Sequence, residues 1–304
     1  MSAIHDVEFD MAELCGWHND PEAVQSVAAL QPFPSFGDTP ANEISTLPKQ
    51  AFLWNAAKKV LGTLLPWRNQ GAIGSCVAHG TNRAILYSLL CEIASGSPEK
   101  YAAIAEEVTY GGSRVEIGRK RIRGDGSVGA WAAEFVRQYG VVARGKYGKY
   151  DLSVYSESTC RSFGDNGVPT ELENIAKTHP VKTITKISTW EEAKKALAQG
   201  YGISVCSNQG FSKVRNQNGV AAPQGSWAHC MCLAGYITLD DGTEYGRIDN
   251  SWGPTYCSGP VGWGEPGPEG FWAQSKIIHK MLQYGDSWAF STVEGFPLRL
   301  DWVI

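Results

Sequence analysis

The sequence predicts an α+β protein in which a helix-rich first half is followed by a strand-rich second half. The long, mostly apolar segment 76–94 stops at a Gly-Ser-Pro triplet and predicts a buried helix. After residue 181 the pattern changes, because segments 181–187 and 202–206 have the composition of strands. Segments 227–237 and 244–248 are separated by an Asp-Asp-Gly turn and predict a hairpin. Two halves of different structure would leave a cleft between them.

Four more helices are predicted from local signals. Segment 49–61 is rich in Ala, Lys and Leu, segment 101–110 precedes two glycines, and segment 131–140 is apolar at helical spacing and ends at a glycine. After residue 188 a helix opens with a capping box, formed either by Ser188 with Glu191 or by Thr189 with Glu192.

Length and charge exclude several classes of protein. The chain has 304 residues, 43% of them hydrophobic, and a formal net charge of −4. This length supports one large core or two smaller ones, and the charge gives no attraction to nucleic acid or anionic membrane. No apolar run reaches the roughly 18 residues of a membrane span, and the acidic N-terminus lacks the pattern of a signal peptide. We therefore expect a protein that binds neither nucleic acid nor membrane and is cytoplasmic or delivered without a signal peptide.

The stretch from Trp67 to Gly80 carries the first candidate for chemistry. Cys76 stands directly before the predicted helix 76–94, and Gln70 precedes it by six positions with two glycines between them. A helix N-terminus favours a thiolate, which is the nucleophilic form of cysteine. Gln70, brought back by a turn, would place its side-chain amide beside Cys76 as a donor to an oxyanion, with the Cys76 backbone N–H as the second donor.

Two later blocks supply a base and a group to orient it. His229 lies in an apolar strand, and Asn250 begins an Asn-Ser-Trp-Gly block at the end of the next strand. Cys, His and Asn are the three groups that a thiol nucleophile, its base and the base's partner require. A second histidine, His79, lies three residues after Cys76 on the predicted helix, where a third residue could hardly orient it as a base.

These three blocks together resemble the papain-like cysteine peptidases, in the order that the family has them. The histidine lies 153 residues after the cysteine (229 − 76) and the asparagine 174 (250 − 76), beyond the 130–150 residues typical of papain and the cathepsins, so insertions are implied. The sequence also departs from the family at Val77, where an aromatic residue is usual, and at Ile73, where secreted members carry a disulfide cysteine. The resemblance implies a distant branch of the family.

The resemblance implies a two-lobe fold with the active site in the cleft. The helical N-terminal lobe would span residues 47–180, and a β-barrel-like C-terminal lobe residues 181–304. The implied reaction is peptide hydrolysis through a thioester on Cys76, with His229 as base, Asn250 as its partner and Gln70 at the oxyanion. The implied partner is a peptide or protein substrate, and no cofactor is implied.

The resemblance also implies substrate-binding positions. Gly126 and Ser127 align with the glycine pair whose backbone binds substrate as an added strand, with Gly129 as the other candidate for the second glycine. Trp252 matches the tryptophan that shields the His–Asn hydrogen bond. Trp227 matches a position bordering the specificity pocket, where its bulk would disfavour large side chains.

Residues 1–46 are predicted to form an N-terminal extension. The proline-rich segment 32–40 cannot be a regular helix. The extension either packs on the domain or acts as a tether, or it inhibits the domain. In that last case Phe33 or Phe36 would lie in the active-site groove.

Two other interpretations compete with the peptidase. Cys230 and Cys232 beside His229 suggest zinc, but no second Cys/His pair stands nearby, so we expect no metal site. The chain could instead be a structural or binding protein, for example one associated with a virion or another larger assembly, that retains the fold with little or no turnover.

Overall fold

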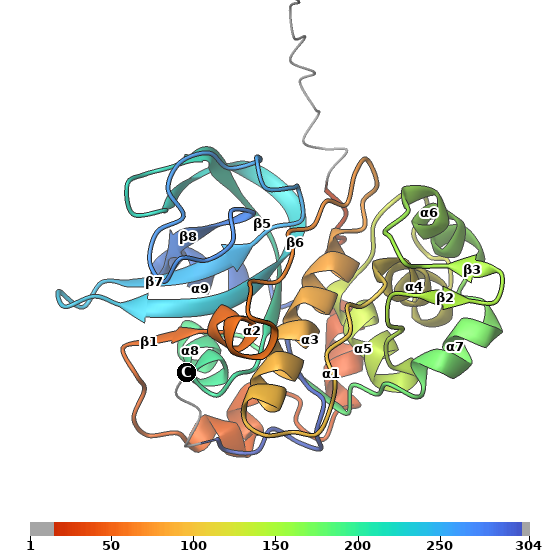
Figure 1. Cartoon of the computed structure of the whole chain (residues 1–304), viewed down its shortest axis with the longest axis horizontal. Helices are drawn as coiled ribbons and strands as arrows, with labels where there is room; N and C mark the ends of the chain where they lie inside the picture. The colour runs from red at the N-terminus through yellow and green to blue at the C-terminus, as the bar shows by residue number, and fades with distance from the viewer. Residues whose placement is uncertain (1–14, 300–304) are drawn as a thin grey trace, which may run out of the picture.

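The computed structural model describes residues 15–299, in which a helical part lies beside an antiparallel sheet (Figure 1). The helices are α1 (Pro21–Ala29), α2 (Trp54–Leu61), α3 (Cys76–Ala94), α4 (Glu106–Gly112), α5 (Gly129–Tyr139), α6 (Glu157–Asn166), α7 (Thr170–Ala176), α8 (Trp190–Ala198) and α9 (Ser275–Leu282), with shorter turns η1 (Phe36–Asp38), η2 (Pro40–Glu43) and η3 (Ser113–Ile117). The strands are β1 (Gln50–Phe52), β2 (Lys146–Tyr147), β3 (Tyr150–Asp151), β4 (Thr183–Lys186), β5 (Ile203–Arg215), β6 (Ala221–Thr238), β7 (Glu244–Asp249), β8 (Gly270–Gln274) and β9 (Ser287–Ser291). This is the α+β fold that the sequence predicts.

Helix α3 forms the junction of the two parts. It contacts strands β5, β6 and β9 of the sheet as well as helices α2, α4 and α5. Sixteen of its 19 residues are buried, which explains why its sequence is apolar around most of its circumference rather than along one stripe. Its first residue, Cys76, therefore lies at the boundary between the helical part and the sheet.

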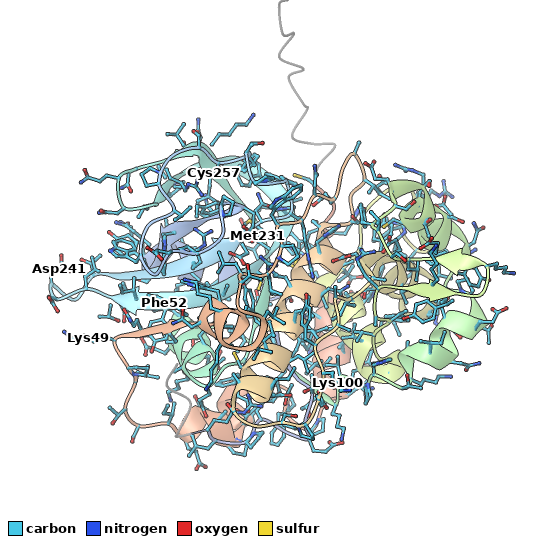
Figure 2. The ribbon with its side chains drawn as sticks, viewed as in Figure 1. Lys49, Phe52, Lys100, Met231, Asp241 and Cys257 are labelled. Carbon is cyan, nitrogen blue, oxygen red and sulfur yellow. The ribbon has the colours of Figure 1, made fainter. Side chains whose placement is uncertain are left out.

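The sheet is built around one long hairpin. The strand order is β4-β9-β5-β6-β7-β8, all neighbours are antiparallel, and β1 adds to β6. Asp241 marks the tip of the β6–β7 hairpin and Met231 the inner part of β6 near the helices (Figure 2). The described strands do not close a barrel. The hairpin sets the positions of His229 on β6 and Asn250 just after β7.

Some predicted boundaries were wrong for tertiary reasons. The helix expected to start at 49 starts at Trp54, because residues 50–52 pair with β6 as β1 and the Phe52 ring stacks on Trp54 at 4.7 Å. The helix expected at 101–110 starts at Glu106 and continues through Gly111 and Gly112 into η3. At both glycines a Cβ would collide with the phenylalanines of neighbouring helices, so their role is close packing rather than a break.

The N-terminal extension packs on the domain over its described length. Asp20 caps α1, which packs against α5. Phe36 is fully buried against Phe296, and the carbonyl of Phe33 accepts a hydrogen bond from Thr185. The prediction that Phe33 or Phe36 lies in the groove was therefore wrong. No helix among residues 15–299 is long and apolar enough to cross a membrane.

Candidate active site

Cys76 is the first residue of α3 and is fully buried. Its sulfur lies beside the backbone amides of Gly16 and Cys230. The side chain belongs to a small packed cluster defined by Trp17, Cys76, Val77, Ala132, Cys206 and Cys230. The thiol thus lies beneath the N-terminal extension as well as at a helix N-terminus.

Burial dominates the acidity of this thiol. The expected helix-terminus effect would lower the pKa of Cys76, but loss of solvent raises its pKa well above the ordinary value, and the amides of Gly16 and Cys230 offset this only in part. A helix N-terminus contributes about 0.3–1 kcal/mol, whereas removing a charge from water costs several kcal/mol. In this state Cys76 is a neutral thiol, contrary to the thiolate that the sequence suggests.

His229 and Asn250 form the pair that the sequence predicts. The His229 ring donates from Nε2 to Asn250 Oδ1 at 2.8 Å, and the same oxygen accepts from the backbone N–H of Ser251 at 2.7 Å. Because an amide oxygen only accepts, the proton of the neutral ring is on Nε2 and the lone pair is on Nδ1. The Trp252 ring stacks on His229 with 4.2 Å between centroids and covers the pair, as the resemblance implies.

The lone-pair nitrogen of His229 is available for a proton. Nδ1 is buried and makes no hydrogen bond within residues 15–299, so Cys76 and His229 are not hydrogen-bonded in this state. Burial lowers the pKa of His229 to about 4, although the bond to Asn250 acts in the opposite direction. A neutral thiol and a neutral imidazole therefore stand at the junction, without an ion pair between them.

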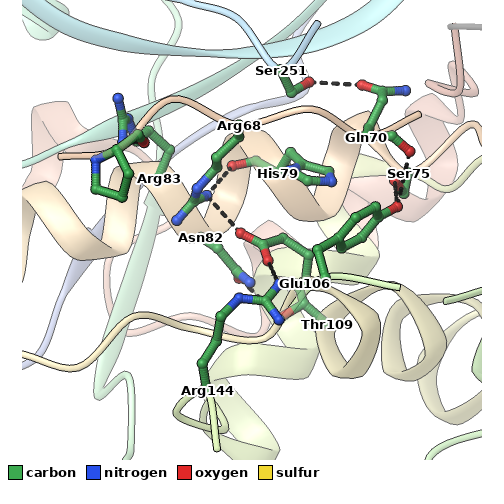
Figure 3. Close-up of polar contacts among 12 residues, drawn as sticks. Arg68, Gln70, Ser75, His79, Asn82, Arg83, Glu106, Thr109, Arg144 and Ser251 are labelled. Atoms are coloured by element: carbon green, nitrogen blue, oxygen red, sulfur yellow. Dashed lines mark hydrogen bonds and ion pairs between the residues drawn. The ribbon is translucent and has the colours of Figure 1, made fainter. Parts of the chain in front are cut away.

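Gln70 is placed near the site, and both ends of its side-chain amide are hydrogen-bonded. Its Nε2 donates to the carbonyl of Ile73 at 2.9 Å, and its Oε1 accepts from Ser251 Oγ at 2.7 Å (Figure 3). The first contact closes the turn before Cys76, and the second ties that turn to the Asn250 block. Because the amide nitrogen of Gln70 carries two N–H groups, the bond to Ile73 uses only one of them, and donation to an oxyanion stays a prediction.

An extended piece of the chain's own N-terminus lies across this site. The amides of Gly16 and Trp17 donate to the carbonyl of Ala228 at 3.0 and 2.9 Å, on the residue before His229. On the other side Ser127 donates to the Gly16 carbonyl at 2.7 Å and accepts from the His18 amide at 2.9 Å. Trp17 and Ser127 thus form a parallel β-bridge. We call residues Gly16–His18 the blocking segment.

Glycines make the close approach of the blocking segment possible. A Cβ at Gly16 would overlap the carbonyl of Gly74, two residues before Cys76. Gly126 has φ +107°, and a Cβ there would lie 2.5 Å from the His18 ring. Gly126 and Ser127 are therefore brought to the site, and their backbone lies against a peptide strand.

Trp227 joins an aromatic cluster that includes Trp252, the ring that covers His229. Its ring lies 4.9 Å from Trp252 and 5.8 Å from Tyr256, and the side chain is nearly buried. Its effect on substrate side chains stays a prediction. Within residues 15–299 no group of three His, Cys, Asp or Glu side chains is arranged to hold a metal ion.

A buried charge network, which no sequence pattern indicated, supports the junction. Arg83 on α3 pairs with Asp249 at 3.2 Å and with Glu269, and Tyr87 donates to Asp249 at 2.7 Å. Near it, Arg68 donates to the carbonyl of His79 and pairs with Glu106, both at 3.0 Å (Figure 3). The network connects α3 to the end of β7, which carries Asn250.

His79 lies in this polar region and not at the reacting groups. Both of its ring nitrogens are buried without a hydrogen-bond partner in the described chain, and burial lowers its pKa to about 3. Its ring packs edge-on against Tyr155 at 5.0 Å. No third residue orients it, as expected from its place on the helix.

The fold and the arrangement of Cys76, His229 and Asn250 define a class of protein. Its members have two parts, one helical and one a sheet, with a thiol at the junction between them. A model of the papain family of cysteine proteases matches residues 50–267. The chain belongs to this family.

Solved structures agree in fold at low sequence identity. Xylellain, a cysteine protease from Xylella fastidiosa, is 16% identical with a TM-score of 0.58, and the match covers 92% of each chain. ProCathepsin B S9 from Trypanosoma congolense is 13% identical with a TM-score of 0.56, over 96% of this chain and 90% of that one. Digestive procathepsin L 3 from the larval midgut of Tenebrio molitor is 15% identical with a TM-score of 0.52, over 89% and 78%. No curated protein matches the sequence.

Proposed function

We propose that this chain is a cysteine peptidase that hydrolyses peptide bonds through a thioester on Cys76, and that the described state is latent. The observation that carries the proposal is the blocking segment. An extended peptide backbone lies directly over Cys76, hydrogen-bonded on one side to Ser127 and on the other to Ala228. A groove that binds one extended peptide by its backbone can bind another, because backbone hydrogen bonds do not depend on sequence.

The bound backbone is not placed for reaction. The group of the blocking segment that lies near the Cys76 sulfur is the amide of Gly16, which donates to the Ala228 carbonyl at 3.0 Å, whereas a thiolate must reach a carbonyl carbon. The blocking segment also runs parallel to the strand segment at Ser127. It therefore occupies the groove without presenting a bond for attack, and it keeps water from the thiol.

The proposed reaction begins when the blocking segment leaves and a substrate takes its place. The Cys76 proton moves to His229 Nδ1, the nitrogen with the lone pair, while Asn250 holds the ring by Nε2. Sulfur bonds to the peptide carbonyl carbon, and the oxyanion accepts from the Cys76 amide and from an N–H of the Gln70 side chain. The C–N bond breaks, His229 returns the proton to the leaving amine, and water hydrolyses the thioester and restores the thiol.

Turnover of a peptide library by the Trp17→Ala chain, in which the blocking segment is weakened, tests this function. We expect cleavage, covalent labelling of Cys76 by an epoxide-type thiol peptidase inhibitor, and loss of both in Trp17→Ala/Cys76→Ala. A Trp17→Ala chain whose Cys76 becomes accessible to alkylating reagents but neither cleaves peptides nor reacts with the epoxide would instead support a binding or structural protein with this fold.

A further inference from the structure

A cavity of about 360 Å³ lies beside helix α3, outside the groove that the blocking segment fills. Its wall is formed by residues 65–69, by side chains of α3, and by segments that lie between residues 101 and 155. None of the described residues that hydrogen-bond the blocking segment lines it. Small-molecule sites in proteins begin at about 300 Å³. The cavity therefore has room for a ligand of its own.

The apolar part of the wall contains the aromatic rings of Trp67, Tyr101 and Tyr155. Trp67 and Val154 are 52% and 77% exposed, so both stand where the cavity opens to solvent. Aromatic rings pack well against other rings, either edge-on or offset. An opening with such walls favours a ligand that has an aromatic body.

The charged part of the described wall is mainly cationic. Three arginines and one glutamate line the cavity, namely Arg68, Arg83, Arg144 and Glu106 (Figure 3). Arg83 and Arg144 each pair with two carboxylates of the described chain. Arg68 pairs there with Glu106 alone and shares it with Arg144. Burial lowers the pKa of Arg68, Glu106 opposes this, and the like charges of the other two arginines lower it further. Of the three cations, Arg68 would therefore gain most from an additional anion.

Arg68 and His79 together offer donors to such an anion. The two described contacts of Arg68, with the His79 carbonyl and with Glu106, both use Nη1, so Nε and Nη2 keep their N–H groups. His79 lines the same cavity and is only 3% exposed, and neither ring nitrogen has a partner within residues 15–299. A neutral imidazole carries one N–H, and leaving a buried donor unpaired costs about 1–3 kcal/mol. A carboxylate would satisfy both residues, because its two oxygens match the guanidinium fork and accept from the imidazole.

One wall of the cavity is tied to the turn before Cys76. The Tyr155 hydroxyl donates to the carbonyl of Gln70 at 3.0 Å and lies 3.0 Å from Ser75 Oγ. None of the three reacting residues lines the cavity. A ligand there would contact the tyrosine that holds the turn without entering the groove.

We propose that this cavity binds a small aromatic monocarboxylate, with the carboxylate on Arg68 and His79 and the ring against Trp67 and Tyr155. The inference goes beyond the proposed function, because binding at this place requires neither the Cys76 thiol nor turnover.

Isothermal titration calorimetry of the full chain with phenylacetate and with phenylacetamide tests the proposal. The two probes have the same size and ring, and only the acid is charged. We expect the acid to bind at least about tenfold more tightly, the effect of one hydrogen bond to a charged group. Equal affinities for the two probes would overturn the proposal, as would no binding of the acid up to about 10 mM.

Two variants of Val154 locate the bound acid. Val154→Glu and Val154→Gln add side chains of the same length at an exposed position, and only Glu brings a negative charge to the opening. We expect phenylacetate to bind at least about threefold more weakly to the Glu variant, the effect of one like charge at short range in water. Val214→Glu, at another exposed valine on β5 that does not line this cavity, is the matched control and should bind as the wild type does. Equal affinity of the two Val154 variants would place the acid elsewhere and overturn the proposal.

The ring of His79 gives a direct readout of the contact. Nitrogen NMR of the histidine-labelled chain resolves the six histidines, and the signals lost in His79→Phe identify this one. We expect its ring nitrogens to shift when phenylacetate is added, and we expect His79→Phe to bind the acid about tenfold more weakly. Binding of the acid with no shift at His79 would overturn the proposal. If His79→Phe does not fold, as judged by thermal melting, the comparison of the Val154 variants decides alone.

Discussion

Replacing Trp17 by Ala should release the blocking segment from Cys76. The variant loses a tryptophan that is 97% covered and a hydrogen bond to the buried carboxylate of Asp286 at 2.8 Å, while the four backbone hydrogen bonds to Ala228 and Ser127 remain. Truncating a buried tryptophan costs about 3–5 kcal/mol. If this whole cost falls on the docking of the segment, the docked-to-open ratio drops by a factor of about 100 to a few thousand.

The assay is the pseudo-first-order alkylation of Cys76, followed by peptide mass mapping. We expect the rate to rise by at least about 100-fold in Trp17→Ala. Leu30→Ala is the control, because Leu30 belongs to the same extension but is 68% exposed. An unchanged rate in a Trp17→Ala protein of normal melting behaviour would refute the idea that the indole holds the segment in the groove.

Three further predictions follow from the described contacts. Gly16→Ala should expose Cys76 as Trp17→Ala does, because its Cβ would overlap the Gly74 carbonyl. The control is Gly37→Ala, whose Cβ would have a Glu192 oxygen at 3.3 Å as its nearest neighbour. Equal rates of Cys76 alkylation in the two variants would contradict the packing argument. Arg83→Met should lower the free energy of unfolding by about 3–5 kcal/mol, since it leaves the buried Glu269 without its ion pair and Asp249 with Arg247 alone. Urea titration should show a loss of less than about 1 kcal/mol for Lys49→Met, which breaks an exposed ion pair, and a similar loss in both variants would count against the network. The pKa values of His79 and His229 lie below the ordinary 6.5, at about 3 and about 4, so between these values and pH 6.5 the unfolded chain binds more protons than the folded one. The stability that comes from keeping both rings neutral is present above pH 6.5 and is lost as the pH falls toward 4. A wild-type urea midpoint that drops with falling pH no more than that of His79→Phe would refute the role of His79.

Elements with strong local signals were predictable from the sequence. Helix α3 occupies residues 76–94 as expected, and the capping box of α8 uses Thr189 with Glu192, one of the two pairs that the sequence left open. The His229–Asn250 contact was predictable because each residue stands in a specific block. Strand β1 was missed because only its partner β6, distant in the chain, favours the extended form over a helix.

The state of the site was not predictable in the same way. Whether Cys76 ionises depends on what covers it, and nothing in Gly16-Trp17-His18 indicates a partner 60 residues away. Asp286 was missed for a related reason, since a single acidic residue before a strand is ordinary until its burial is known. In sequence, the one available signal was the short Gly-Trp pair in an otherwise acidic extension.

In the proposed peptidase, the blocking segment would compete with substrates as a tethered ligand, because it is part of the same polypeptide. Short tethers give effective concentrations in the millimolar range, which do not change when the protein is diluted. A peptide present at micromolar levels would lose this competition even with equal intrinsic affinity. The onset of turnover would then follow a lag set by loss or cleavage of the tether. The length of this lag would not depend on the protein concentration.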